Sequence, residues 1–181
     1  MATSAGAPHR IELNLPEVAS LFNTMDASPF RAKDLDGGAE EFIVSWANEF
    51  PLREPISLRV HLETWPAADP TSLISDAVHN YFRYRGEVAD LEFKRLMRQG
   101  RISLAIGVIF LAICFSAASL LIPKEGAIGP YLSESLTIAG WVAMWRPMEI
   151  YLYDWWPVRR RARNFFRLSE MPVVVTRTAL A

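Results

Sequence analysis

The sequence predicts an α+β protein in which a small cytoplasmic α/β head is joined to a two-helix transmembrane hairpin. Three observations lead to this fold class. In the first 70 residues, two short runs of alternating apolar and polar side chains flank an amphipathic helical pattern. Residues 102–123 carry no charge and form a run long enough to cross a bilayer. A second apolar segment, 132–153, ends in aromatic and basic residues typical of a membrane interface.

Residues 1–69 form the predicted head, which is acidic. The first 70 residues carry five Lys or Arg against eleven Asp or Glu, whereas the rest of the chain carries fourteen against nine. Side chains alternate at 11–15 and at 56–62, which predicts two strands. Between them, residues 39–50 have apolar side chains at helical spacing. This order favours a small sheet covered on one face.

Two further features complete the predicted head and its connection to the bilayer. Asp36 or Gly37 can cap the helix of the head. The β-prone residues 173–176 return on the same side as the head, and whether they join its sheet is left open. Asp69 and Pro70 predict the start of a long helix, since proline is tolerated in a first helical turn. Its apolar rhythm continues through residues 70–101, which form a helical stalk.

The first predicted transmembrane helix, residues 102–123, follows the stalk directly. A helix of this length spans about 33 Å, against a hydrocarbon core of about 30 Å. The run is apolar on every face, and so short a chain has little else to bury such a helix. The second crossing is predicted at 132–153, with an external loop at 124–131 and a basic juxtamembrane segment with a C-terminal strand or tail at 154–181.

Basic residues near the apolar segments predict the orientation. Residues 82–101 hold six Lys or Arg and residues 157–176 hold five, whereas the connection 123–131 holds only Lys124. The positive-inside rule then places both termini in the cytoplasm and the connection outside. The same asymmetry favours two crossings over one.

An ionisable cluster interrupts the second apolar segment. Arg146 and Glu149 are three residues apart, where an ion pair can form, and Pro147 between them predicts a kink that frees the carbonyl of Ala143. Arg146 could extend to the cytoplasmic surface, but helical side chains lean toward the helix N-terminus, so it starts out pointing away from the basic end. From there it could donate to the carbonyl of Ala143. Three roles are open: fixing the helix pair or an oligomer, binding a partner subunit or lipid headgroup, and lining an ion or proton path.

The basic segment after the second crossing predicts contact with membrane lipids. Its residues are Trp155, Trp156, Arg159, Arg160, Arg161 and Arg163. A basic and aromatic run can also bind nucleic acid, but directly after a membrane segment it is typical of a topology signal and of anionic-lipid contact. We therefore expect lipid partners and no nucleic acid.

No pattern in the chain predicts a catalytic, cofactor or metal site. The acidic residues 34–41 do not have the spacing of a calcium loop, and the three histidines are scattered. Small residues four apart offer faces for close helix packing, namely Ser103 with Gly107, Ala112 with Ser116, and Ala139 with Ala143. They favour a homo-oligomer or a partner membrane protein.

The segment 145–157, which reads WRPMEIYLYDWWP, and the stretch 21–26, LFNTMD, resemble uncharacterised bacterial two-span membrane proteins. The resemblance implies a multi-pass protein of the bacterial inner (plasma) membrane and no particular activity. The function we expect is that of an accessory or scaffolding protein with a cytoplasmic protein-interaction head. The alternative is a subunit of an oligomeric ion channel or transporter, with an enzyme of lipid metabolism third.

Overall fold

The computed structural model describes residues 9–23, 34–120 and 128–178. The chain divides into two compact units: unit 1 contains Met1–Ala89 and Arg160–Ala181, and unit 2 contains Asp90–Arg159. Unit 1 is therefore built from both ends of the chain. The end of the predicted first crossing, 121–123, and the first half of the predicted external loop, 124–127, with Lys124, lie outside the described residues.

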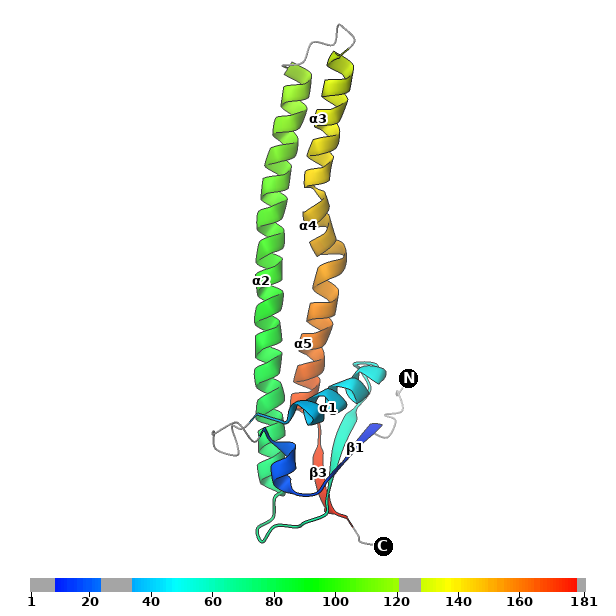
Figure 1. Ribbon diagram of the computed structural model, residues 1–181, viewed down its shortest axis with the longest axis vertical. Coiled ribbons are helices and arrows are strands. Elements are labelled where there is room, and N and C mark those ends of the chain that lie inside the picture. The colour runs from blue at the N-terminus through cyan, green and yellow to red at the C-terminus, as the bar shows by residue number, and fades with distance from the viewer. Residues whose placement is uncertain (1–8, 24–33, 121–127, 179–181) are drawn as a thin grey trace, which may run out of the picture. The chain divides into compact units, whose positions relative to one another are not determined.

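Unit 1 contains a three-stranded parallel sheet (Figure 1). The strands are β1 (His9–Leu15), β2 (Ile56–Leu62) and β3 (Val173–Arg177), in the order β1-β2-β3. Ile11 lies opposite Leu58, and Leu58 lies opposite Val173. The predicted α+β class is confirmed, and the C-terminal β-prone run does join the sheet.

One face of the sheet is buried under helices. Along β2 the side chains alternate between buried and partly exposed, as a strand with one covered face requires. The helices are α1 (Gly37–Glu49), the short 3-10 helix η1 (Val18–Leu21), the beginning of α2 (Thr71–Leu120) and the end of α5 (Trp155–Ser169). The largest side chains that are fully buried in this core are Ile11, Leu21, Phe22, Ile43, Leu58, Leu62, Ile74, Phe82 and Leu168.

Asp36 and Asp69 begin the two helices for which they were predicted. Oδ2 of Asp36 accepts hydrogen bonds from the backbone N–H groups of Gly38 (2.9 Å) and Ala39 (3.3 Å), which satisfies two unpaired donors of α1. Oδ1 of Asp69 accepts from the backbone N–H of Thr71 at 3.0 Å and from its hydroxyl at 2.7 Å. These bonds lower the pKa of Asp69, the side-chain bond more than the backbone bond.

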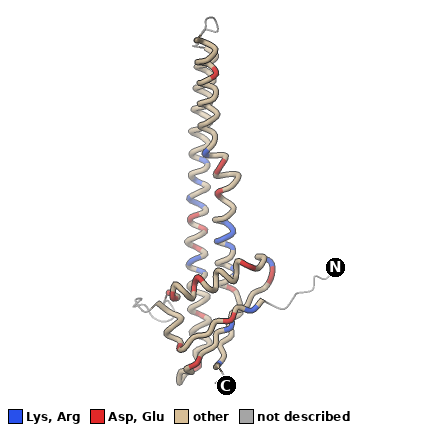
Figure 2. Tube along the Cα trace, turned by 45° about the vertical axis from the view of Figure 1, so that its right-hand side comes forward, with Lys and Arg blue, Asp and Glu red and all other residues tan. Residues whose placement is uncertain are grey.

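The described residues of unit 2 are helical apart from Ile128 and Met144, which flank α3. After the remainder of α2 come α3 (Gly129–Ala143), α4 (Trp145–Glu149), the π-helix η3 (Ile150–Asp154) and the start of α5. Among the described residues one helix, α2, is long and apolar enough to cross a membrane. The second predicted crossing, 132–153, is divided among α3, α4 and η3. Figure 2 shows a long uncharged stretch in α2 and another in the segment that contains α3.

Glycines lie where the two helical segments of unit 2 approach each other. A Cβ atom at Gly100 would come within 2.9 Å of the Ile150 side chain, and one at Gly107 within 3.1 Å of the Ala143 carbonyl oxygen. At Gly140 it would meet Leu111 at 2.8 Å and Cys114 at 3.3 Å. On α2 the contact residues thus recur every seven positions, which is typical of helices that cross at a small angle.

The predicted small-residue faces take part in this helix contact only in part. Gly107 and Ala143 do meet, whereas Ala112, Ser116 and Ala139 are exposed and face away from this contact. The structure instead uses residues seven apart on α2. Which small residues meet depends on the face that each helix turns to its neighbour, and the spacing along one helix does not set that face.

Candidate functional site

The sequence-predicted ion pair is part of a three-residue cluster on α4 and η3. Nη1 of Arg146 donates to Oε2 of Glu149 at 2.8 Å and to Oδ2 of Asp154 at 3.3 Å. The side chains are 50%, 43% and 33% exposed, respectively. The cluster therefore combines one cation with two carboxylates, and ligands can reach all three. Asp154 is the member that sequence reasoning missed.

The π-helix explains how Asp154 comes within reach of Arg146. Eight residues rise about 12 Å along an α-helix, which is a long span for one arginine side chain. The turn formed by η3 accommodates an extra residue, as π-turns within α-helices do, often at functional sites. Both carboxylates also lean toward the N-terminal end of their helix, and so toward Arg146.

The geometry of Arg146 differs from the sequence-based interpretation in two respects. Its guanidinium extends toward Asp154, hence toward the basic end of its helix, because the two carboxylates on that side outweigh the intrinsic lean of a helical side chain. It also donates to those carboxylates and not to the Ala143 carbonyl, which faces Gly107. Helix α3 ends at Ala143 and α4 begins at Trp145, so the helical run is interrupted at Met144, three residues before the buried Pro147.

The basic and aromatic residues of α5 are distributed over both units. In unit 2, the guanidinium of Arg159 lies 5.7 Å from the ring centre of Phe93 and 6.0 Å from that of Trp155. In unit 1, Arg161 lies 5.7 Å from the ring centre of Phe165, which the Arg85 guanidinium also approaches at 5.4 Å. Cation–π contacts of this kind hold each guanidinium group near the face of an aromatic ring. Arg160, Arg163 and Trp156 are exposed.

A second candidate site is a hollow of about 400 Å³ in unit 1. It is lined by residues that follow β1 and β2, among them Glu17, Val18, Ala19, Thr64 and Pro66, and by Asp69 and Leu73 at the start of α2. Parallel strands of α/β sheets commonly present ligand sites beyond their carboxyl ends. The lining is mainly apolar, its ionisable members are Glu17 and Asp69, and the hydrogen bonds from Thr71 keep Asp69 charged.

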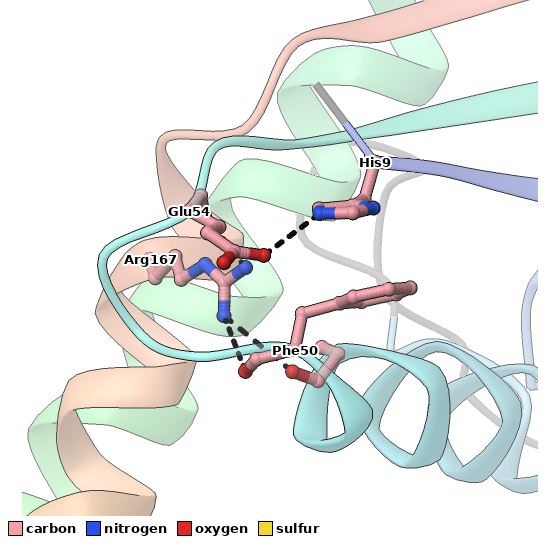
Figure 3. A network of polar contacts seen from close by, with 5 residues as sticks. His9, Phe50, Glu54 and Arg167 are labelled. Atoms are coloured by element: carbon pink, nitrogen blue, oxygen red, sulfur yellow. Dashed lines mark hydrogen bonds and ion pairs between the residues drawn. The ribbon is translucent and has the colours of Figure 1, made fainter. Parts of the chain in front are cut away.

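An arginine of α5 joins three parts of unit 1 (Figure 3). Arg167 donates to the carbonyl oxygens of Ala47 (3.4 Å), Phe50 (3.5 Å) and Glu54 (2.8 Å), at the C-terminal end of α1 and in the loop before β2. Burial lowers the pKa of Arg167, and nearby Glu54 partly offsets that effect. Sequence reasoning missed this contact because its partners are more than a hundred positions apart.

His9 extends the same network to the first strand. Its ring stacks on Phe50 with ring centres 4.0 Å apart, and its Nε2 lies 2.7 Å from Oε2 of Glu54. These contacts join β1, the end of α1 and α5 to one another.

Among the residues that the structure describes, the outer face of the sheet carries the closest approach to a catalytic arrangement. A hydrogen bond of 2.9 Å joins Thr176 to Nδ1 of His61, whose Nε2 lies 4.0 Å from Glu12. The second distance is too long for a hydrogen bond, and the side chains lie across an open sheet face away from the hollow. Within the described ranges, no group of three or more His, Cys, Asp or Glu side chains is placed to hold a metal ion.

Comparisons with known proteins return no relatives for this chain. No protein family, no curated protein and no solved structure matches it.

Proposed function

We propose that this chain is an integral protein of the bacterial inner membrane that crosses the bilayer twice and holds its head at the cytoplasmic face as an accessory or scaffolding protein. The observation that carries the proposal is the continuity of α2. Its first turns bury Ile74, Val78 and Phe82 in the core of unit 1, and the same helix continues without a break to Leu120. One continuous helix thus contains both residues of the head core and the apolar stretch.

The surface of that apolar stretch supports insertion. Large side chains point outward along it, with Ile106, Ile109, Ile113 and Phe115 each at least 60% exposed. Water-soluble proteins rarely expose a contiguous apolar patch of more than a few hundred Å². Contact with the hydrocarbon of a bilayer removes the free-energy penalty that this apolar surface has in water.

Packing within unit 2 supports a second crossing. The segment containing α3 and α4 lies against α2 through Gly107 and Gly140, so it would accompany α2 through the bilayer. The break at Met144 and the charges of the cluster make it less apolar than α2. The excess of Lys and Arg around residues 82–101 and 157–176 supports a cytoplasmic head.

The acidic hollow of unit 1 is the surface that we assign to the partner protein. An apolar hollow whose ionisable groups are Glu17 and Asp69 favours a peptide segment with an apolar side chain next to Lys or Arg. Charged rims mainly set specificity and the rate of association, and the apolar lining contributes the affinity.

The native mass of the complex, extracted gently from its own membrane, tests this function. We expect a stoichiometric second protein to co-purify with the wild-type chain and to be lost from the variants Glu17→Arg and Ala19→Arg. The control Glu49→Arg, which reverses a charge on α1 just as Glu17→Arg does in the hollow, should retain it. A complex that contains this chain alone would contradict the accessory role. Retention of the partner by all three variants would contradict the hollow as its docking surface.

A channel or transporter subunit is the second candidate, and the exposed cluster favours it. Two helices cannot enclose a pore, so this function requires an oligomer in which Arg146 and Glu149 of several copies line a path. Ion flux through vesicles reconstituted with the purified protein separates the two proposals. Flux that Arg146→Ala or Glu149→Ala abolishes would replace the accessory role with the transport role.

A further inference from the structure

We propose that the cluster of Arg146, Glu149 and Asp154 binds the headgroup of a zwitterionic phospholipid that carries a primary ammonium group. The phosphate would contact Arg146, and the ammonium would lie between the two carboxylates. The inference rests on the proposed insertion into a membrane, and it assigns a ligand to a site that an accessory role does not require.

The cluster retains unused binding capacity on both of its charged parts. The hydrogen bonds of Arg146 to Glu149 and Asp154 both use Nη1, which leaves Nη2 and Nε for a phosphate oxygen. On the carboxylates, Oε2 of Glu149 and Oδ2 of Asp154 are engaged, which leaves Oε1 and Oδ1 as acceptors. With one cation and two anions, the cluster matches a ligand that itself carries both signs.

The order of the charges along the helix matches the order in such a lipid. Arg146 lies nearer to the apolar residues of α3, and Asp154 lies eight residues further toward the basic part of α5. In a phospholipid the phosphate is attached to the glycerol, and the amine lies further out toward water. A lipid in the leaflet on the side of the basic residues of α5 would therefore meet the cation with its phosphate and the carboxylates with its amine.

In a bilayer that surrounds the apolar stretch of α2, the cluster would lie at headgroup depth. Gly100 faces Ile150 across the helix contact, and Arg101 is the last charged residue on α2 before its apolar stretch. The cluster thus flanks the end of that stretch. Trp145, Tyr153 and Trp156 are 72%, 71% and 65% exposed around it, as interfacial aromatic residues are.

The same charges discriminate among lipid classes. Two carboxylates repel a headgroup that carries only negative charge. A choline group is cationic but has no N–H donor, so it cannot form charge-assisted hydrogen bonds with Glu149 and Asp154. A primary ammonium donates three. We therefore expect preference for phosphatidylethanolamine over both phosphatidylcholine and phosphatidylglycerol.

Native mass spectrometry of the full chain in detergent tests the assignment. The probes are phosphatidylethanolamine, its N-monomethyl and N,N-dimethyl derivatives, phosphatidylcholine and phosphatidylglycerol, all with the same acyl chains. Retention should fall stepwise as methyl groups replace the N–H donors of the ammonium. We expect phosphatidylethanolamine to be retained about fivefold or more over phosphatidylcholine, because phosphatidylcholine cannot form the charge-assisted hydrogen bonds. The double change Glu149→Gln with Asp154→Asn should remove this gradient, whereas Glu134→Gln, an exposed carboxylate of α3, should leave it intact.

Equal retention of all five lipids, preference for choline through the exposed aromatic rings, or a gradient that survives the double change would each overturn the assignment. The single change Asp154→Asn keeps the Arg146–Glu149 pair and so controls for misfolding of the double variant. The lipid gradient of this single variant should be smaller than that of the wild-type chain. Extraction of the wild-type chain from membranes by alkaline carbonate would contradict membrane insertion itself. Resistance to that wash without any lipid preference would contradict the headgroup site alone.

Discussion

Three side chains join α1 to α2 in unit 1 through a shared carboxylate. The hydroxyl of Tyr81 donates to Oε2 of Glu40 at 2.6 Å, and Arg85 forms an ion pair with Oε1 of the same residue at 2.6 Å. Burial, and then the bond to Glu40, raise the pKa of Tyr81 well above its usual value near 10. The phenol therefore stays protonated up to a higher pH in the folded state than in the unfolded state.

This difference predicts a specific loss of stability in alkali. The contribution of Tyr81 is complete below about pH 10, where the unfolded phenol begins to ionise, and is lost as the pH rises above that value. Each pH unit above it should remove up to about 1.4 kcal/mol from the free energy of unfolding. Tyr81→Phe should cost about 1 kcal/mol at pH 8 and should flatten the decline between pH 10 and 11.5.

Urea unfolding in detergent at a series of pH values measures both effects. Tyr84→Phe on the same helix is the matched control, since Tyr84 is 61% exposed. A decline of equal slope in wild type and Tyr81→Phe would contradict the assignment of the alkaline loss to this phenol.

Arg167 is the second residue whose removal has a predictable cost. It supplies a cation and hydrogen-bond donors to carbonyl groups at the end of α1, where the helix dipole favours positive charge. We expect Arg167→Ala to lower the free energy of unfolding by about 1–2 kcal/mol, since the group is partly exposed and solvent screens part of its effect. Arg160→Ala, an exposed position on the same helix, should change it by less than about 0.5 kcal/mol. Equal effects of the two changes would argue against a specific role.

At the scale of the element, the close approach of α2 and α3 depends on glycines. A side chain at Gly107 would press on the backbone oxygen of Ala143, which cannot rotate away, and on Met144. Overpacking of this kind costs about 1–3 kcal/mol. We therefore expect Gly107→Leu to lower the Tm of the full chain in detergent, whereas Ala112→Leu, on the exposed face of α2, should not.

The elements also show how far local sequence rules extend. Alternating side chains predicted β1 and β2, and Asp36 and Asp69 predicted two helix starts, because each signal involves neighbours along the chain. The π-turn at Ile150–Asp154 and the reach of Arg146 to Asp154 were not predictable in this way. They depend on which distant groups meet the segment, and no spacing rule encodes that.

At the scale of the molecule, the head is not the N-terminal segment that the acidic composition suggests. Its core includes Ala162, Phe165, Leu168, Met171 and Val175, which follow the second helical segment of unit 2. The parallel pairing of β2 with β3 explains why, since a parallel neighbour requires a long crossover, here made of α2 to α5. The sequence revealed the strands but not their partners or direction.

This arrangement predicts how the head behaves when it is cut from the chain. A fragment of residues 1–101 contains the whole predicted head and stalk but lacks β3 and the end of α5. Loss of a large buried side chain such as Phe165 or Leu168 costs about 2–5 kcal/mol. Several such losses exceed the total stability of a small domain, about 5–15 kcal/mol. The fragment should therefore show no cooperative unfolding transition.

A chain in which a six-residue Gly/Ser linker replaces residues 90–159 should fold instead. Gly86 of α2 lies against Phe166 of α5, so the two cut ends belong to neighbouring helices, and six residues reach up to about 20 Å. Because this chain keeps the buried side chains on both sides of the cut, we expect it to be soluble without detergent and to unfold cooperatively by circular dichroism. The comparison of the two fragments is decisive, since they differ in whether the C-terminal part of the core is present. Cooperative unfolding of residues 1–101 would mean that α5 and β3 are dispensable, and failure of the linked chain alone would mean that the head depends on unit 2.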